Sequence, residues 1–206
     1  MIEVFGWVAA AIGMASFFPQ LIRIIRARTA AGVSLRNWQF LVGTQGAWCA
    51  HGFLVGVVQM QWPNLVMVLT ALAIVVFIRK ERGRPVLPAL VVPLLIIAAL
   101  YAIDVFVGGA AFGLIVAIPQ VGGQMAQLRE ILRSTDLSGI SLGYLSINLL
   151  VNAMWTVFGF VTVEWALMVC ATAMTVICSI NLITYLTRRR RAGRVISDAT
   201  AVPASL

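Results

Sequence analysis

A duplicated pattern of glycine, serine and tryptophan constrains the fold of this chain more than any other feature. The pattern occurs twice in the same order: Gly32-Val33-Ser34, Trp48 and Gly52-Phe53, then Gly139-Ile140-Ser141, Trp155 and Gly159-Phe160. Equivalent residues are 107 positions apart, so both copies share one register. Most of these positions lie in apolar stretches, which indicates a membrane-embedded unit used twice. Paired units of this kind typically hold a substrate site between them.

The composition agrees with a membrane protein. Of the 206 residues, 61% are hydrophobic and 11% are charged, and a soluble domain of this length needs a far more charged surface. A bilayer-spanning helix takes about 20 apolar residues. The sequence predicts an all-α integral membrane protein with seven transmembrane helices, at residues 3–25, 37–58, 61–79, 86–107, 109–130, 141–161 and 163–186. No signal-peptide pattern precedes the first helix, which we expect to be retained.

The charged residues orient these helices. All 15 Lys and Arg residues fall in four groups that follow alternate spans, within 23–36, 79–84, 129–133 and 188–194. The opposite ends carry only Glu3, Asp104 and Glu164. The positive-inside rule then predicts an N-terminus outside and a C-terminus in the cytoplasm. It also accounts for the net charge of +8 without nucleic acid as a partner, and the arginines at 188–191 are expected near anionic lipid head groups.

The orientation explains how the two copies are joined. Three spans placed directly after three others would be inverted, and one extra span between them restores a common direction. We therefore expect two parallel triple-helix repeats joined by a linker helix, in a 3+1+3 arrangement. The predicted boundaries are 1–82 for the first repeat, 83–107 for the linker, 108–187 for the second repeat and 188–206 for a basic, disordered cytoplasmic tail.

Two polar stripes mark a candidate pocket. At helical spacing, Leu41, Gln45, Trp48 and Gly52 share one face, and Asn148, Asn152, Trp155 and Gly159 share the matching face of the second copy. An indole packs against the C–H face of a sugar, and amides hydrogen-bond its hydroxyls. The alternative is structural, because amides also join transmembrane helices. Four further tryptophans near span ends are expected to be interface anchors, Trp7, Trp38, Trp62 and Trp165.

Motifs around these stripes resemble a known family. Phe18-Pro19-Gln20-Leu21 ends the first span, the Gly-Val-Ser and Trp48 follow, and Trp62-Pro63-Asn64 opens the third. The chain resembles the PQ-loop (MtN3/saliva) superfamily, and its seven-helix layout resembles SWEET sugar transporters, with each half similar to a SemiSWEET subunit. The resemblance implies a sugar site of Trp48, Asn64 and Trp155. The position 107 after Asn64 is Ala171, with Thr172 beside it, so Gln45, Asn152 and Thr172 complete the predicted substrate-binding set.

Candidate hinge and gate residues lie nearer the span ends. Pro19 removes a helical hydrogen bond, so a kink is expected there, either static or, as the resemblance implies, an inner-gate hinge. Gln20 is placed to satisfy a carbonyl that the proline frees. The equivalents in the second copy are Ala126 and Gln127, while a separate Pro119-Gln120 pair lies seven residues before Ala126. The only histidine, His51, lies outward of Trp48 and is expected to pack or to line a gate, without binding a metal or relaying protons.

The residue types and motifs that this sequence lacks favour a transporter over an enzyme. Mid-depth Asp, Glu and Lys are missing from the predicted spans, which favours facilitation without proton coupling. Catalytic motifs, cofactor motifs and metal-ligand spacings are missing too, so an enzyme is not expected.

The sequence therefore predicts a bidirectional, facilitative plasma-membrane transporter of a small neutral solute, a mono- or disaccharide, by alternating access. Its partners are that solute and the lipid bilayer, and a homo-oligomer is compatible with the sequence. Two alternatives fit the same residues: a PQ-loop transporter of an amino acid, nucleoside or vitamin precursor, and a non-transporting membrane receptor or assembly factor.

Overall fold

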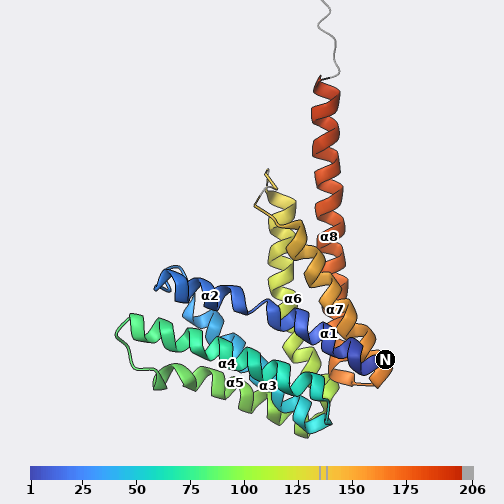
Figure 1. Cartoon of the computed structure of the whole chain (residues 1–206). Helices are drawn as coiled ribbons and strands as arrows, with labels where there is room; N and C mark the ends of the chain where they lie inside the picture. The colour runs from blue at the N-terminus through green and yellow to red at the C-terminus, as the bar shows by residue number, and fades with distance from the viewer. Residues whose placement is uncertain (135, 138, 201–206) are drawn as a thin grey trace, which may run out of the picture.

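The computed structural model describes the backbone of residues 1–134, 136–137 and 139–200, and side chains of these residues up to Arg190. Regular structure in this part of the chain is entirely helical (Figure 1). The helices are α1 (Ile2–Ala15), α2 (Phe18–Ala27), α3 (Leu35–Val55), α4 (Val58–Glu81), α5 (Leu87–Phe106), α6 (Gly109–Arg133), α7 (Leu142–Thr162) and α8 (Trp165–Thr200). Each of the seven predicted spans lies on a helix, and the first is divided into α1 and α2.

Six segments of the described chain are long and apolar enough to cross a membrane, with α1 and α2 counted as one. The α3 helix is not among them, because polar residues such as Asn37, Gln39 and His51 lower its hydropathy. Several polar side chains beyond its first turn are buried, among them Gln39, Thr44 and His51. The fold is that of a multi-pass membrane protein in which α3 is an interior helix.

The helices form two sets that meet at one corner. In the first set α4 contacts α1, α2 and α3, and in the second α8 contacts α6 and α7. The α5 helix packs against α3 and also touches α6, while α1 reaches α7. Helices α3, α4 and α5 run in one direction and α6 and α8 in another (Figure 1). We call the place where the two sets meet, near the N-terminus, the corner.

The 107-residue register is kept by the backbone. Ser34 caps α3 by accepting the Asn37 amide, and Ser141 caps α7 by accepting the Tyr144 amide. The two helices also end alike. Gly56 and Val163, again 107 apart, both take left-handed conformations, with φ of 72° and 55°. Equivalent residues therefore make equivalent turns in the two copies.

Close helix contacts repeat in the same way. A Cβ added at Gly52 would lie 2.9 Å from the Gln61 amide nitrogen, and one at Gly159 would lie 3.0 Å from the Met168 amide nitrogen. Glycine at these two positions lets α3 approach α4, and α7 approach α8, at backbone distance. The motif glycines of the sequence thus have a packing role.

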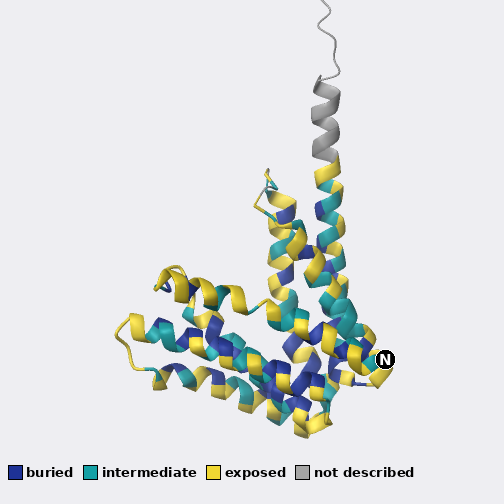
Figure 2. Ribbon diagram, viewed as in Figure 1, coloured by how far each residue is buried: buried dark blue, intermediate teal, exposed yellow. Residues whose placement is uncertain are grey.

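The outer faces are apolar. Exposed large side chains run along the helices, among them Leu94, Phe106, Ile118 and Ile183 (Figure 2). A soluble protein does not leave so much apolar surface uncovered, whereas lipid covers it in a membrane protein. Trp7, Trp62 and Trp165 are likewise exposed. The expectation for Trp38 was wrong, because Trp38 is buried and its ring packs edge-on against Phe17, with centroids 6.0 Å apart.

The C-terminal helix is longer than expected. It continues from Trp165 to Thr200, past the predicted span end at residue 186, and the last part of the predicted tail, 201–206, lies outside the described residues. Arg188 does not point only to lipid head groups, because its Nη1 donates to the carbonyl oxygens of Ile131 and Ser134 at the end of α6. This contact satisfies carbonyls that a helix end leaves unpaired.

Candidate functional site

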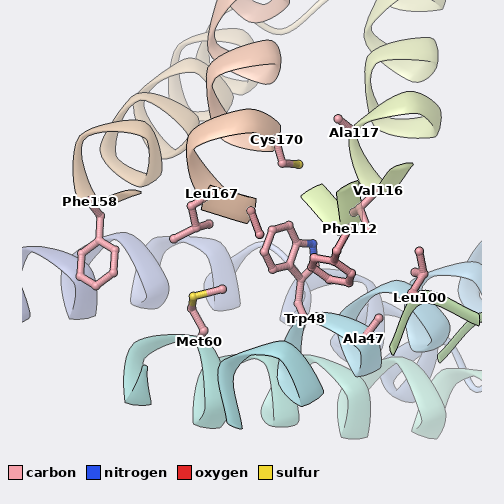
Figure 3. Close-up of a cluster of buried hydrophobic side chains, with 11 residues drawn as sticks. Ala47, Trp48, Met60, Leu100, Phe112, Val116, Ala117, Phe158, Leu167 and Cys170 are labelled. Atoms are coloured by element: carbon pink, nitrogen blue, oxygen red, sulfur yellow. The ribbon is translucent and has the colours of Figure 1, made fainter. Parts of the chain in front are cut away.

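Trp48 lies at the junction of the two helix sets. It is buried in the corner cluster, which we define as the apolar residues drawn in Figure 3: Ala47, Trp48, Met60, Leu100, Phe112, Val116, Ala117, Phe158, Ala166, Leu167 and Cys170. The indole meets the Phe112 ring edge-on, with centroids 4.8 Å apart. Since Phe112 comes from α6, this contact joins the first set to the second.

Trp155 approaches the same cluster from the other side. It is half-buried on α7 and packs against the corner cluster, with its ring 5.6 Å from that of Phe158. The two predicted pocket tryptophans therefore contact one shared cluster, although they come from different sets. In this conformation the space around Trp48 is filled by apolar side chains.

The predicted amides of the first set are bonded within their own bundle. Asn64 is buried, and its side-chain nitrogen donates to the Met60 carbonyl at 2.7 Å, one turn earlier on α4. Gln45 is half-buried on α3 and approaches the Met67 sulfur at 3.6 Å. Both residues lie on the face that α3 and α4 share, away from lipid.

The polar residues of the second set form a chain along α7. Asn152 donates to the carbonyl and side-chain oxygens of Asn148, both at 2.8 Å, and Thr156 donates to the Asn152 carbonyl. Thr156 also shares a 2.9 Å hydrogen bond with Thr175 of α8. The Thr172 hydroxyl differs, because it is buried without a hydrogen-bond partner in the described chain. Thr172 is thus the predicted site residue with unused hydrogen-bonding capacity.

His51 has the polar contacts that the sequence did not predict. Only 1% of its surface is exposed, and each ring nitrogen meets a carboxylate. Nδ1 lies 2.6 Å from Oδ2 of Asp104, in the last turn of α5, and Nε2 lies 2.9 Å from Oε1 of Glu164, between α7 and α8. We call these three residues the His51 network. It joins the first set, the α5 helix and the second set at the corner.

Glu164 also begins α8. Its carboxylate accepts the amides of Ala166 at 3.1 Å and Leu167 at 2.7 Å, which caps the helix. Burial acts to raise the pKa of this carboxyl, but the hydrogen bonds from His51 and from the two amides outweigh burial and hold the pKa below its ordinary value. A carboxylate with a lowered pKa stabilises the fold above its unfolded pKa, and this contribution is lost as pH falls through the folded pKa.

A hollow opens next to the His51 network. It encloses about 380 Å³ and is lined by all three residues of the network, together with Val55, Val57, Gly109 and Trp165. The His51 ring also stacks on Phe112 at 4.8 Å and meets Trp48 edge-on at 5.7 Å. The buried imidazole therefore lies between the hollow and two aromatic rings of the corner cluster.

The expected kink in the first span is present. Helix α1 ends at Ala15 and α2 starts at Phe18, with Pro19 in its first turn, where a missing amide hydrogen costs least. The Ser16 hydroxyl donates to the Gly13 carbonyl at 2.6 Å. Gln20 does not satisfy a freed carbonyl, because its side chain has no hydrogen-bond partner among the described residues.

The second copy has no such break. Pro119 lies within the continuous helix α6, and Gln120 only approaches the Cys170 sulfur at 3.9 Å. Gln127, the equivalent of Gln20, is half-buried beside a second hollow of about 380 Å³ that it shares with Glu130 and Tyr144. The two gate candidates thus lie in different backbone settings.

A comparison with known protein families supports the description of this chain as a multi-pass membrane protein. The family model of the PQ loop repeat matches residues 1–37, which cover α1, α2 and the turn before α3. This part of the chain is similar to a PQ-loop repeat, in a family that includes transporters. No curated protein matches the chain.

Sequence reasoning missed the partners of His51. Asp104 and Glu164 were interpreted only as charges at span ends, yet both are buried, at 5% and 8% exposure. A usable signal was present, because the positive-inside pattern places His51, Asp104 and Glu164 at the same side of the membrane. A histidine and two acids at one depth predict an ion network in a membrane protein.

Proposed function

We propose that this protein is a membrane transporter that moves a small neutral solute, a mono- or disaccharide, by alternating access. The moving parts are two parallel three-helix bundles: α1–α2, α3 and α4 in the first, and α6, α7 and α8 in the second. Helix α5 is the linker of the 3+1+3 arrangement. The proposal includes neither catalysis nor a cofactor.

One observation carries the proposal. The matched helices α3 and α7 bring Trp48 and Trp155 to the same cluster at the junction of the bundles. A substrate site between structural repeats is the recurring arrangement in transporters of this type. Gln45 and Asn152 each lie three residues before an indole on α3 and α7, while Asn64 and Thr172 belong to α4 and α8. Such a mixture suits a neutral solute with hydroxyl groups.

The charge pattern supports an outward-facing corner. Glu3 starts α1, while Asp104 and Glu164 lie at the corner itself. The arginines and the lysine lie at the opposite helix ends, for example Arg79 and Lys80 in the last turn of α4. The positive-inside rule then favours a corner on the outside and all four basic segments in the cytoplasm. We propose the cell membrane as the location.

The direction of movement follows from the corner. The bundles touch there and diverge toward their other ends (Figure 1). Helices in a bilayer tilt by about 20° on average, so rotation about the corner must bring the bundles closer to parallel in a membrane. We propose that the corner is the closed, outer end of the pathway and that the α1–α2 break at Pro19 lies on its inner half.

Flux into liposomes tests the proposal. Purified protein should accelerate equilibration of labelled glucose or sucrose without a proton gradient. Trp48→Ala with Trp155→Ala should reduce this flux at least about tenfold, because each indole supplies stacking area worth about 1 kcal/mol or more. Trp62→Ala is the matched control, since Trp62 is exposed on α4 and should leave flux unchanged. A folded protein that moves none of a panel of sugars would refute the sugar assignment.

The second copy favours one alternative substrate class. Ala171 stands where the first copy has Asn64, and the neighbouring Thr172 hydroxyl has no hydrogen-bond partner among the described residues. A less polar second half fits an amino acid, a nucleoside or a vitamin precursor. Thermal-shift screening across these classes separates them from sugars, because a ligand stabilises the state that binds it. A receptor or assembly factor would instead keep partner co-purification in the double tryptophan variant.

A further inference from the structure

We propose that the His51 network is a proton-binding site that holds the outer end closed, and that release of its proton to the outside allows this end to open. The inference rests on the proposed transport function for its consequence, but not for its chemistry. It differs from the expectation that His51 is only a packing or gate-lining residue.

The geometry fixes the number of protons. Both carboxylate contacts of the ring are short, 2.6 Å to Asp104 and 2.9 Å to Glu164. A neutral imidazole has one N–H donor and one lone pair. One of the two contacts would then direct a lone pair at a carboxylate oxygen. With both carboxylates ionised, both contacts are attractive only when His51 carries a second proton and donates from each nitrogen.

Because the network is buried, loss of this proton changes the stability of the closed corner. His51, Asp104 and Glu164 are all nearly inaccessible, at 1%, 5% and 8% exposure. A buried charge without its partner costs several kcal/mol, so loss of the proton leaves two carboxylates that destabilise the closed corner. Asp104 adds to this cost because it lies in the last turn of α5, where the helix dipole disfavours a negative charge. Separation of α3 from α5 and the α7–α8 turn lets water reach both carboxylates.

The duplicated scaffold has an apolar counterpart of the His51 network. The equivalent of His51 in the second copy is Phe158, and the equivalent of Glu164 in the first copy is Val57. Phe158 belongs to the corner cluster and Val57 packs against it. One half of the corner is thus apolar and the other half is ionic. Only the ionic half makes closure depend on proton binding.

The hollow beside His51 supplies the route for the proton. It is lined by all three residues of the network and lies at the corner, the proposed outer end. The released proton passes from the imidazolium to water there, which leaves neutral imidazole and hydronium. On the side of the corner cluster the ring contacts Phe112 and Trp48, whose rings offer the proton no acceptor. The site therefore senses the pH of the outer compartment alone.

The other groups near the ring do not replace these contacts. From α6, Phe112 and Gly109 face the ring, and from α3 itself Trp48 does; all three are uncharged. The Cys49 thiol on α3 donates to the Gln61 carbonyl of α4 instead. Glu3 on α1 and the N-terminal amine are exposed to solvent. The titration of the corner thus belongs to the His51 network.

The direction of the pH effect follows by linkage. A proton that binds the closed form more tightly stabilises closure at low pH, and this stabilisation is lost as pH rises. A hydrogen bond to a charged group contributes enough to shift a two-state population by about tenfold or more. The outward-open fraction should therefore rise about tenfold between pH 6 and pH 9.5 on the outer side.

Spin-label distances test this without a solute. Phe53→Cys and Phe160→Cys place labels at equivalent, exposed positions of the two bundles, in a chain whose three buried cysteines are replaced by alanine. Double electron–electron resonance in liposomes should show a single short distance at pH 6 and a growing longer distance as pH rises. A distance distribution that stays constant from pH 5.5 to pH 10 would overturn the proposal.

Variants separate proton binding from simple packing. Glu164→Gln removes one buried carboxylate and should weaken the pH dependence of the distances, whereas Glu3→Gln, which removes an exposed carboxylate, should behave as the parent chain. The triple variant His51→Phe, Asp104→Leu and Glu164→Val copies the apolar half and should stay closed at every pH. The proposal fails if Glu3→Gln changes the distances as much as Glu164→Gln, or if the triple variant still titrates.

The same measurement keeps the two proposals distinct. Distances that titrate in a protein that moves no tested solute would uphold the proton site and refute transport. Flux together with distances that ignore pH would uphold transport and refute the proton site.

Discussion

The two bundles share a backbone and differ in their polar groups. Serine caps, left-handed helix ends and close glycine contacts recur 107 residues apart. The polar side chains do not recur: Asn64 corresponds to Ala171, and His51 corresponds to Phe158. The comparison teaches that the scaffold was kept because helix packing demands it, while the polar groups diverged.

The first helix of each bundle shows the same contrast. Phe17 lies at the break between α1 and α2, and its partner position on α4 is occupied by the buried Ile74. The equivalent pair in the second bundle is Gln124 and Asn181, which are joined by hydrogen bonds of 2.9 and 3.1 Å from the Asn181 amide. The first bundle thus has a break packed by apolar residues, and the second has a continuous helix tied by an amide pair.

Alanine at Gly113 should produce the largest effect. A Cβ there would lie 2.8 Å from the Cα of Ala166 and closer still to its carbonyl oxygen, so the backbone of α8 must move. We expect a loss of about 3 kcal/mol in unfolding free energy. The equivalent Gly6→Ala meets the Phe158 ring and the Gln59 side chain, which can rearrange, and should cost about half as much. Unfolding in mixed detergent micelles measures both.

Gly122→Ala is the control on the same helix. Nothing lies within 4 Å of a Cβ at Gly122, and alanine favours a helix, so stability should be unchanged or slightly higher. Gly113 packs against backbone, whereas Gly6 packs against side chains. Equal losses of unfolding free energy for Gly113→Ala and Gly6→Ala would contradict this difference.

Exchanging the proline between the two bundles should have the next largest effect. Ala126→Pro places a proline in the continuous helix α6, at the position equivalent to Pro19, and should cost about 3 kcal/mol or slightly less because the site is exposed. Pro19→Ala restores an amide hydrogen at the break, so it should join α1 to α2 and slow flux if the break is a hinge. Circular dichroism and the liposome assay measure the two effects. Unchanged flux would make the break a static kink.

The amide pair of the second bundle should contribute less. Asn181→Ile copies Ile74 and leaves the oxygens of Gln124 without their donor, at a cost of about 1–2 kcal/mol. Adding Gln124→Phe copies both residues of the first bundle and should recover much of that loss, because replacing both partners removes the unpaired groups. If the double variant is less stable than the single one, the bundles are not equivalent at this position.

Much of the fold could be predicted because it follows from hydropathy and register. Six of the seven spans needed only apolar length, the α3 span also needed the duplicated register, and the break near Pro19 needed only proline chemistry. The site was harder. Trp48 could be placed at a junction, but Phe112, which contacts it, has no motif that a single sequence reveals. Asp104 and His51 are 53 residues apart and become neighbours only because α5 packs on α3, a contact that spacing along the chain does not encode.

The smallest effect should be equal in the two bundles. Ser34 and Ser141 each accept one amide at the start of α3 and α7, at 3.3 and 3.2 Å, and both are exposed. Ser34→Ala and Ser141→Ala should each cost about 1 kcal/mol, the usual contribution of an N-cap side chain. Since the caps belong to the duplicated scaffold and not to the diverged polar groups, the two losses should agree within about 0.5 kcal/mol when measured by unfolding in the same micelles. A clear difference between the two losses would mean that the helix starts of the two bundles are not equivalent in stability.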